Sequence, residues 1–264
     1  MKPDYASAWH DLYSGFTKWH IWTRLGWQEV KRRYRRTVLG PFWATMSIGM
    51  FIGGMAFIWA PLFRTSVTDY LPFLAAGLVA WTYTTSLITE GCTTYTASEG
   101  LIKQLSFPFS ILNYMVVWRN IIVFFHNLVI VALVNVVLPV DVTWATLLFI
   151  PGILIVALNG LWITILLGML SARFRDIPPL IGNLVTIMMF VTPVFWRSEQ
   201  LGPNAQRYID LNFMYHLIEV IRAPLLGHVP ALLSYWVTLA GVPIGAVVTF
   251  AVYARFRSRI AYWL

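Results

Sequence analysis

The chain has 264 residues, of which 58% are hydrophobic and only 11% charged, and its mean hydropathy is +0.68. Soluble domains do not reach such values, so this composition excludes a soluble globular enzyme. Six membrane-spanning segments of about 20 residues would use roughly half of the chain and leave no stretch for a folded aqueous domain. The single cysteine, Cys92, excludes an intrachain disulfide and a zinc site built from several thiolates.

The first 39 residues form a segment rich in tryptophan and basic side chains. Eight of the 19 Lys and Arg residues lie before residue 40, and the first apolar run starts too late for a cleavable signal peptide. Wound at about 100° per residue, residues 19–38 place their basic side chains mostly opposite an apolar face. That face holds Trp19, Trp22, Trp27, Val30 and Tyr34. We expect an amphipathic helix in the headgroup region of the membrane.

Two interpretations of the basic run in this segment stay open. Positive charge next to the first span sets topology and attracts anionic lipids. Alternatively, Arg32, Arg33, Arg35 and Arg36 bind the phosphorylated headgroup of a lipid substrate, since guanidinium groups match phosphate oxygens in a bidentate way.

Six apolar runs are long enough for a helix to cross about 30 Å of hydrocarbon. They cover residues 40–63, 71–89, 113–138, 144–170, 178–196 and 231–253. An even number of spans places both termini on one side. With the termini inside, 15 basic residues are internal and four external, which favours cytoplasmic termini.

The predicted fold is therefore an all-α polytopic membrane protein with six transmembrane helices. Residues 1–264 form a single transmembrane domain, with a cytoplasmic amphipathic segment over 1–39, the six spans over 40–253, and a cytoplasmic tail over 254–264.

Residues 197–230, between spans five and six, alternate apolar and polar stretches, and none of the stretches reaches spanning length. We expect a re-entrant or interfacial segment here, with a surface loop as the alternative. Within it, His216, Glu219 and Arg222 could share one helix face. One histidine and one carboxylate make an incomplete metal set, so the preferred interpretation is a structural polar cluster and no metal site.

Nucleotide-binding and zinc-protease motifs are both missing from the sequence. It contains neither a phosphate-binding loop ending in Gly-Lys-Ser/Thr nor a His-Glu-x-x-His pair, so it does not predict an ATP-driven pump on its own or a bound cofactor. Aromatic residues make up 16% of the chain. Sugar rings stack on aromatic faces, which makes aromatic side chains in or near spans one and five candidates for lining a sugar path. These are Phe42, Trp43, Phe51, Phe190, Phe195 and Trp196.

Five motifs in chain order resemble the membrane subunits of ABC exporters for O-antigen, capsule and teichoic acid polysaccharides. The stretch 31–43 (KRRYRRTVLGPFW) resembles that family's entry to the first span, and 172–178 (ARFRDIP) its short internal loop. Residues 99–108 (EGLIKQLSFP) resemble its cytoplasmic coupling segment. Residues 192–196 (TPVFW) resemble the end of its span five, and 217–222 (LIEVIR) its re-entrant region. The sequence departs from the family pattern at Phe213, where a proline is usual.

The resemblance implies a homodimer with a sugar channel at its interface, bound to two copies of a separate ABC ATPase subunit that holds ATP and magnesium. The substrate would be a polysaccharide on a polyprenyl diphosphate or phospholipid anchor, exported across the bacterial inner membrane. Membrane lipids are further partners, and no nucleic acid is expected.

The coupling segment would then be a helix over residues 95–107 that docks into the ATPase. Leu101, Ile102 and Leu105 recur at helical spacing, and Glu99 can pair with Lys103 one turn away. Pro108 would end this helix.

Two other function classes stay in view. An intramembrane enzyme acting on lipid-linked sugars would need clustered acidic or histidine groups, whereas Glu90, Glu99 and Asp176 are scattered in sequence. An ABC exporter of a smaller lipid or drug usually carries a large external domain, for which this sequence leaves no room.

Overall fold

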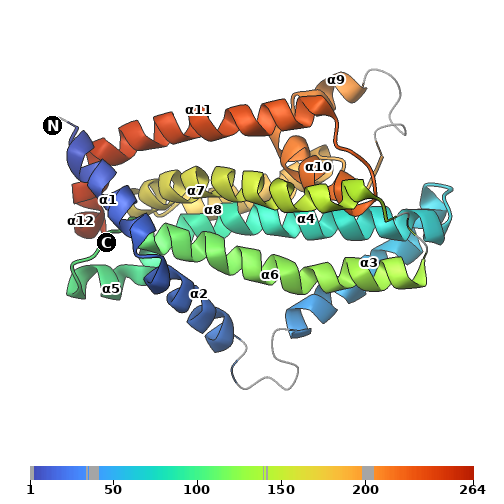
Figure 1. The fold of residues 1–264 in the computed structure, drawn as a ribbon, viewed down its shortest axis with the longest axis horizontal. Helices are drawn as coiled ribbons and strands as arrows, with labels where there is room; N and C mark the ends of the chain where they lie inside the picture. The colour runs from blue at the N-terminus through green and yellow to red at the C-terminus, as the bar shows by residue number, and fades with distance from the viewer. Residues whose placement is uncertain (1–2, 34, 36–41, 139, 141, 198–204) are drawn as a thin grey trace.

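The computed structural model describes residues 3–33, 35, 42–138, 140, 142–197 and 205–264, and over these residues it contains helices and turns but no strands. Within the described part, five helical stretches are long and apolar enough to cross a membrane. They lie in α3 (Phe42–Leu62), α4 (Val67–Thr93), α6 (Ser110–Val137), α7 (Phe149–Arg173) and α11 (Leu232–Phe256) (Figure 1). The predicted all-α polytopic fold and five of the predicted spans are confirmed.

The fifth predicted span, 178–196, is the shorter helix α8 (Ile177–Val191). Its 15 residues extend for about 22 Å, which is less than the hydrocarbon thickness. The helix stops because Pro193 disfavours the helical conformation at Thr192, whose φ and ψ of −90° and 135° are extended. A sixth crossing therefore stays a prediction.

Helix α4 is the centre of the bundle. It packs against α3, α6, α7, α8 and α10, and 16 of its 27 residues are buried, compared with six of the 25 residues of α11. Small residues allow this close packing. A Cβ atom at Gly77 would lie 2.9 Å from the carbonyl oxygen of Val194, so only glycine lets the turn after α8 approach α4 so closely.

One end of the bundle, called here the terminal end, carries both chain termini (Figure 1). Helices α1 (Tyr5–Thr17) and α2 (Trp19–Arg33) cross it, together with η1 (Thr96–Ser98), α5 (Glu99–Gln104), η4 (Arg257–Arg259) and α12 (Ile260–Trp263). Helix α2 confirms the predicted helix over its first fifteen residues. The predicted Trp face is only partly buried: Val30 packs inward, whereas Trp19 and Trp27 are exposed.

The other end, called here the opposite end, carries η2 (Trp144–Leu148), α9 (Ala205–Asp210) and α10 (Phe213–Leu225). Asn212 caps α10 by accepting hydrogen bonds from the backbone N–H groups of Met214 and Tyr215. Phe213 is thus the first helical residue, the position at which proline also fits best. The departure from the family pattern at Phe213 leaves the start of this helix intact.

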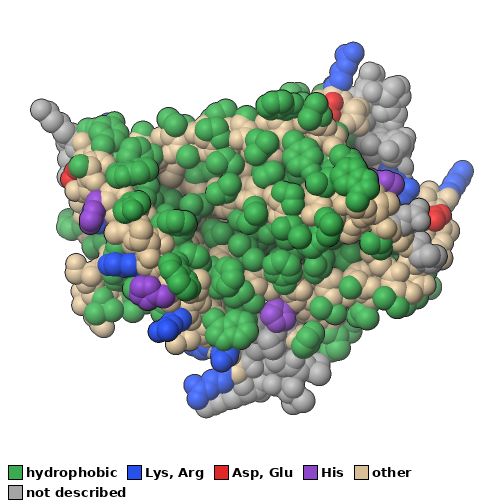
Figure 2. Space-filling model, in the orientation of Figure 1, with side chains coloured by type: hydrophobic (Ala, Val, Ile, Leu, Met, Phe, Trp, Pro, Cys, Tyr) green, Lys and Arg blue, Asp and Glu red, His purple; other side chains and the backbone are tan. Residues whose placement is uncertain are grey.

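The space-filling view shows that hydrophobic side chains cover the middle of the visible face, while many of its Lys, Arg and His side chains lie toward the ends (Figure 2). Such a belt is typical of a protein whose flanks contact lipid.

Asp11 fastens α1 to the bundle from a buried position. Its carboxylate accepts hydrogen bonds from the backbone N–H groups of Phe109 and Ser110, at 3.0 Å each, where α6 begins. It also accepts from the Tyr253 hydroxyl at 2.9 Å and from the Arg257 guanidinium at 2.7 Å. Three distant parts of the chain therefore meet at one carboxylate.

We expect Asp11→Asn to loosen α1, because the new amide N–H₂ would face donors where an acceptor is needed. Losing a buried charged hydrogen-bond acceptor costs on the order of 3 kcal/mol. Hydrogen exchange of the α1 amides should then accelerate roughly a hundredfold. The control is Asp4→Asn at the exposed N-cap of α1, which should change exchange much less. Equal exchange in the two variants would contradict this role of Asp11.

Candidate functional site

Two of the predicted headgroup arginines, Arg32 and Arg33, lie in the last turn of α2, and Arg35 follows two residues after the helix ends. Arg32 and Arg35 are exposed, and Arg36 lies outside the described residues. Arg33 forms an ion pair with Glu90 of α4, with 2.9 Å between its Nη2 and Oε1. The structure thus ties one of the four predicted residues to the bundle and leaves two at the surface.

Glu90 is the centre of a charged network that sequence reasoning missed. It accepts hydrogen bonds from the Arg119 guanidinium at 2.6 Å and from the Asn120 amide at 2.8 Å, both on α6. Arg119 also pairs with Glu29 of α2. The network therefore fixes α2 against α4 and α6. The available signal was the polar pair Arg119-Asn120 inside an otherwise apolar run, since charges at membrane depth are usually paired.

The predicted coupling segment folds as η1 and α5, and helix α5 ends at Gln104, earlier than expected. Glu99 and Lys103 form the predicted i,i+4 pair at 2.6 Å, and the hydrogen bond from Lys103 lowers the pKa of Glu99. Leu101 and Leu105 are 44% and 57% exposed, whereas Ile102 is buried against the bundle. The segment therefore presents two leucines outward and is held by the isoleucine between them.

The aromatic residues predicted to line a channel divide into two groups. Phe42, Trp43 and Phe51 on α3 and Phe190 on α8 are all more than half exposed, and both helices pack against α4. Phe195 is buried, with its ring centroid 5.3 Å from that of Trp59. Trp196 is half-buried and donates its indole N–H to the Phe190 carbonyl at 3.0 Å.

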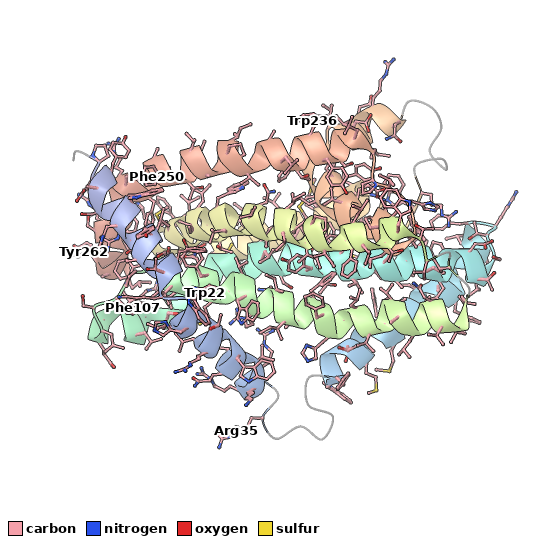
Figure 3. The ribbon with its side chains drawn as sticks, viewed as in Figure 1. Trp22, Arg35, Phe107, Trp236, Phe250 and Tyr262 are labelled. Atoms are coloured by element: carbon pink, nitrogen blue, oxygen red, sulfur yellow. The ribbon has the colours of Figure 1, made fainter. Side chains whose placement is uncertain are left out.

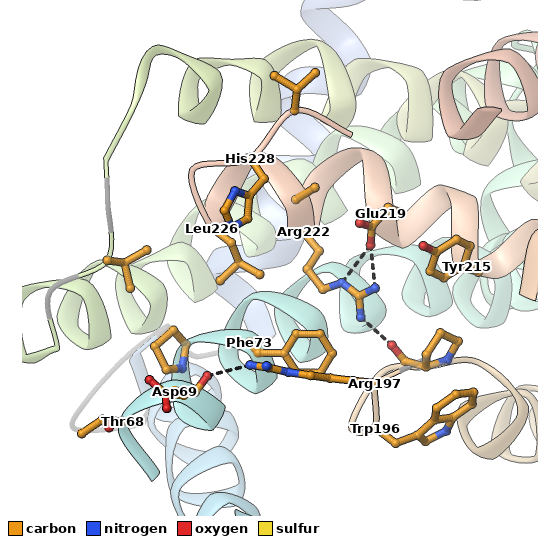
Figure 4. A pocket seen from close by; sticks show the side chains of 15 residues that line it. Thr68, Asp69, Phe73, Trp196, Arg197, Tyr215, Glu219, Arg222, Leu226 and His228 are labelled. Atoms are coloured by element: carbon orange, nitrogen blue, oxygen red, sulfur yellow. Dashed lines mark hydrogen bonds and ion pairs between the residues drawn. The ribbon is translucent and has the colours of Figure 1, made fainter. Parts of the chain in front are cut away.

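At the opposite end, the start of α4, the turn after α8 and helix α10 line an open cavity of about 640 Å³ (Figure 4). Arg222 donates to Glu219 from Nε at 2.9 Å and from Nη2 at 2.6 Å, and also to the Pro193 carbonyl at 2.5 Å. Two members of the predicted polar cluster therefore line one cavity.

His216, the third member, lies apart from this pair. Its ring nitrogens contact the Ser234 hydroxyl and the Asp210 carbonyl, each at 2.9 Å, so it joins α10 to α11. No group of three His, Cys, Asp or Glu residues in the described part of the chain could hold a metal ion.

Comparison with known proteins identifies the family of this chain. Residues 21–226 match the ABC-2 type transporter family, a range from α2 to the end of α10 that covers most of the chain. The chain belongs to this family. It is a transport subunit rather than an enzyme, and an ABC-2 subunit of this kind works with an ABC ATPase subunit.

Two curated relatives with the name O-antigen export system permease protein RfbA are similar to this ABC-2 chain. The protein from Myxococcus xanthus is 24% identical over 203 residues, which is 76% of this chain and 78% of the relative. The protein from Klebsiella pneumoniae is 25% identical over 195 residues, with 72% and 74% coverage.

We expect Glu90→Ala to destabilise the terminal end, because Arg119 would keep one carboxylate partner at a largely buried position. A loss on the order of 2 kcal/mol corresponds to a fall of about 4–8 °C in the melting temperature. Thermal unfolding of the purified protein in detergent measures this. The matched control is Glu99→Ala, which breaks an exposed pair and should leave the melting temperature nearly unchanged. Equal shifts in both variants would show that the network is not structural.

Proposed function

We propose that this ABC-2 subunit exports a lipid-linked polysaccharide of the O-antigen type from the cytoplasmic side of a bacterial inner membrane. The observation that carries the proposal is the similarity, over about three quarters of the chain, to O-antigen export permeases. The fold supports it, since five helical stretches of the described residues are long and apolar enough to cross a membrane and many basic residues gather at the terminal end.

In the working assembly, two copies of this chain form a homodimer that binds two ATPase subunits. ATP and magnesium are bound by the ATPase subunits. The exposed aromatic faces of α3 and α8 support a dimer interface, because both helices leave large apolar side chains more than half exposed in one copy. The sugar path then runs between the two copies, past Phe42, Trp43, Phe51 and Phe190.

Placing the terminal end in the cytoplasm follows the bias of basic residues. The short helix α8 and the turn after it complete a sixth crossing in this arrangement, and α9 and α10 form the re-entrant segment. Backbone at membrane depth is tolerated there because α10 is buried by protein on one side. A lipid diphosphate in the cytoplasmic leaflet would meet Arg32 and Arg35 first.

The rival functions lack support in the structure. Among the candidate catalytic carboxylates, Glu90 accepts hydrogen bonds from three side chains and Glu99 pairs with Lys103, so neither is poised as a general base. The similarity to O-antigen export permeases also favours a polysaccharide over a small lipid or drug.

Gene deletion in the source strain tests the function. Cells without this chain should lose their surface glycan and accumulate the lipid-linked glycan inside, and a plasmid copy should restore export. Unchanged surface glycan in the deletion strain would refute the proposal.

The coupling role of α5 predicts which positions reach the ATPase. Cysteine at Leu101 or Leu105 should crosslink to the ATPase subunit in the complete transporter, because both side chains point outward. Cysteine at Ile102 is the matched control: it lies between them but is buried, so it should crosslink poorly. Equal crosslinking at all three positions, or none at the two leucines, would show that this surface does not dock.

The headgroup role predicts a selective effect of removing Arg32 and Arg35. Each positive charge near an anionic surface contributes on the order of 1 kcal/mol, so losing two should raise the half-saturating substrate concentration about thirtyfold. The double variant Arg32→Gln, Arg35→Gln is compared with the unmodified protein in proteoliposomes, by the substrate concentration that half-saturates the stimulated ATPase activity. The control is Lys18→Gln, Arg24→Gln, which removes two exposed charges from the same end. The same change in both variants would indicate general lipid attraction only.

A further inference from the structure

The cavity at the opposite end has a lining unlike that of the apolar flanks. Arg197 and Arg222 both stack on Phe73, with guanidinium carbons 5.0 Å and 4.8 Å from the ring centroid (Figure 4). Trp196 and Tyr215 add two more aromatic rings to the wall. Figure 3 shows the side chains along the whole ribbon, with Phe107, Phe250 and Tyr262 labelled near the terminal end.

Charge in this lining cancels. It contains two guanidinium groups, of Arg197 and Arg222, and two carboxylates, of Asp69 and Glu219, so the formal charge of the four groups is zero. Arg222 donates to Glu219 and to a backbone carbonyl, and Arg197 donates to the Asp69 carbonyl at 3.0 Å. Such a wall carries no net charge to attract a free anion, because the attraction of its guanidinium groups is opposed by the repulsion of its carboxylates. It does offer hydrogen-bond acceptors beside donors.

Sugar hydroxyl groups match this pattern, because each one both donates and accepts a hydrogen bond. Sugar rings also carry apolar C–H faces, which pack on aromatic side chains. A cavity of about 640 Å³ lies within the range of small-ligand sites in proteins.

Trp196 links this cavity to the candidate sugar path. Its indole N–H holds the carbonyl of Phe190, and Phe190 is an exposed aromatic residue on α8. One turn of chain therefore separates the proposed channel surface from the cavity wall.

We infer that this cavity binds a neutral sugar unit of the exported glycan where the glycan leaves the transporter. The inference rests on the proposed function. Tyr215 and Trp196 provide the stacking surfaces, and the Glu219–Arg222 pair binds adjacent hydroxyl groups.

The test uses the complete transporter in nanodiscs and, as probe, the lipid-free oligosaccharide released by mild acid from the strain's own surface glycan. Binding is measured by saturation-transfer NMR. Tyr215→Ala should weaken binding about threefold to tenfold, the loss expected for one aromatic contact, while Tyr215→Phe should stay near the unmodified value. Tyr208→Ala, an exposed tyrosine of α9 outside the cavity, is the control and should bind normally.

Unchanged binding in Tyr215→Ala would overturn the inference, and so would displacement of the oligosaccharide by excess inorganic phosphate, which would mark an anion site. Neither result would contradict the proposed function, which is tested separately by glycan export in the deletion strain.

Discussion

A charge at membrane depth must be paired, and this constraint organises the whole protein. The pairs of Asp11 with Arg257 and of Glu90 with Arg119 each join parts of the structure that hydrophobic packing alone would leave free to slide. Arg222 pairs with Glu219 on its own helix and joins α10 to the turn after α8 through the Pro193 carbonyl. The first two pairs fix α1 and α2 across the ends of the spans. The basic residues at the surface can then act on a ligand because other carboxylates and arginines already hold the helices.

Helix length is the second constraint. The long helices match or exceed the hydrocarbon thickness, whereas Pro193 stops α8 short of it. The chain then turns against α4 at Gly77 and continues into α10. The shortened helix places Phe190 and Trp196 where the proposed sugar path meets the cavity at the opposite end.

Much of the fold could be predicted from the sequence because long apolar runs bounded by charges have few alternatives. Five spans, the helix from Trp19 and the Glu99–Lys103 pair follow from local periodicity. The end of α8 is also a local effect of Pro193. It was not predicted, because the apolar run continues past this proline.

The long-range contacts could not be predicted. Asp11 meets Tyr253 and Arg257 across 242 and 246 residues, and no spacing rule connects them. The same holds for Glu90, which appeared as one of several scattered carboxylates. Ile102 and Phe195 lie on predicted functional surfaces, but tertiary packing buries both. Periodicity shows which residues share a face and leaves open what that face contacts.

The central claim is that this chain provides the membrane path for a lipid-linked glycan and draws its energy from a separate ATPase. Translocation in proteoliposomes tests it most directly, with the purified chain, its ATPase subunit and the lipid-linked glycan, read as glycan made accessible to an added glycosidase. We expect ATP-dependent translocation only when both subunits are present. Translocation without the ATPase, or ATP hydrolysis by both subunits together with no glycan moved, would contradict the account.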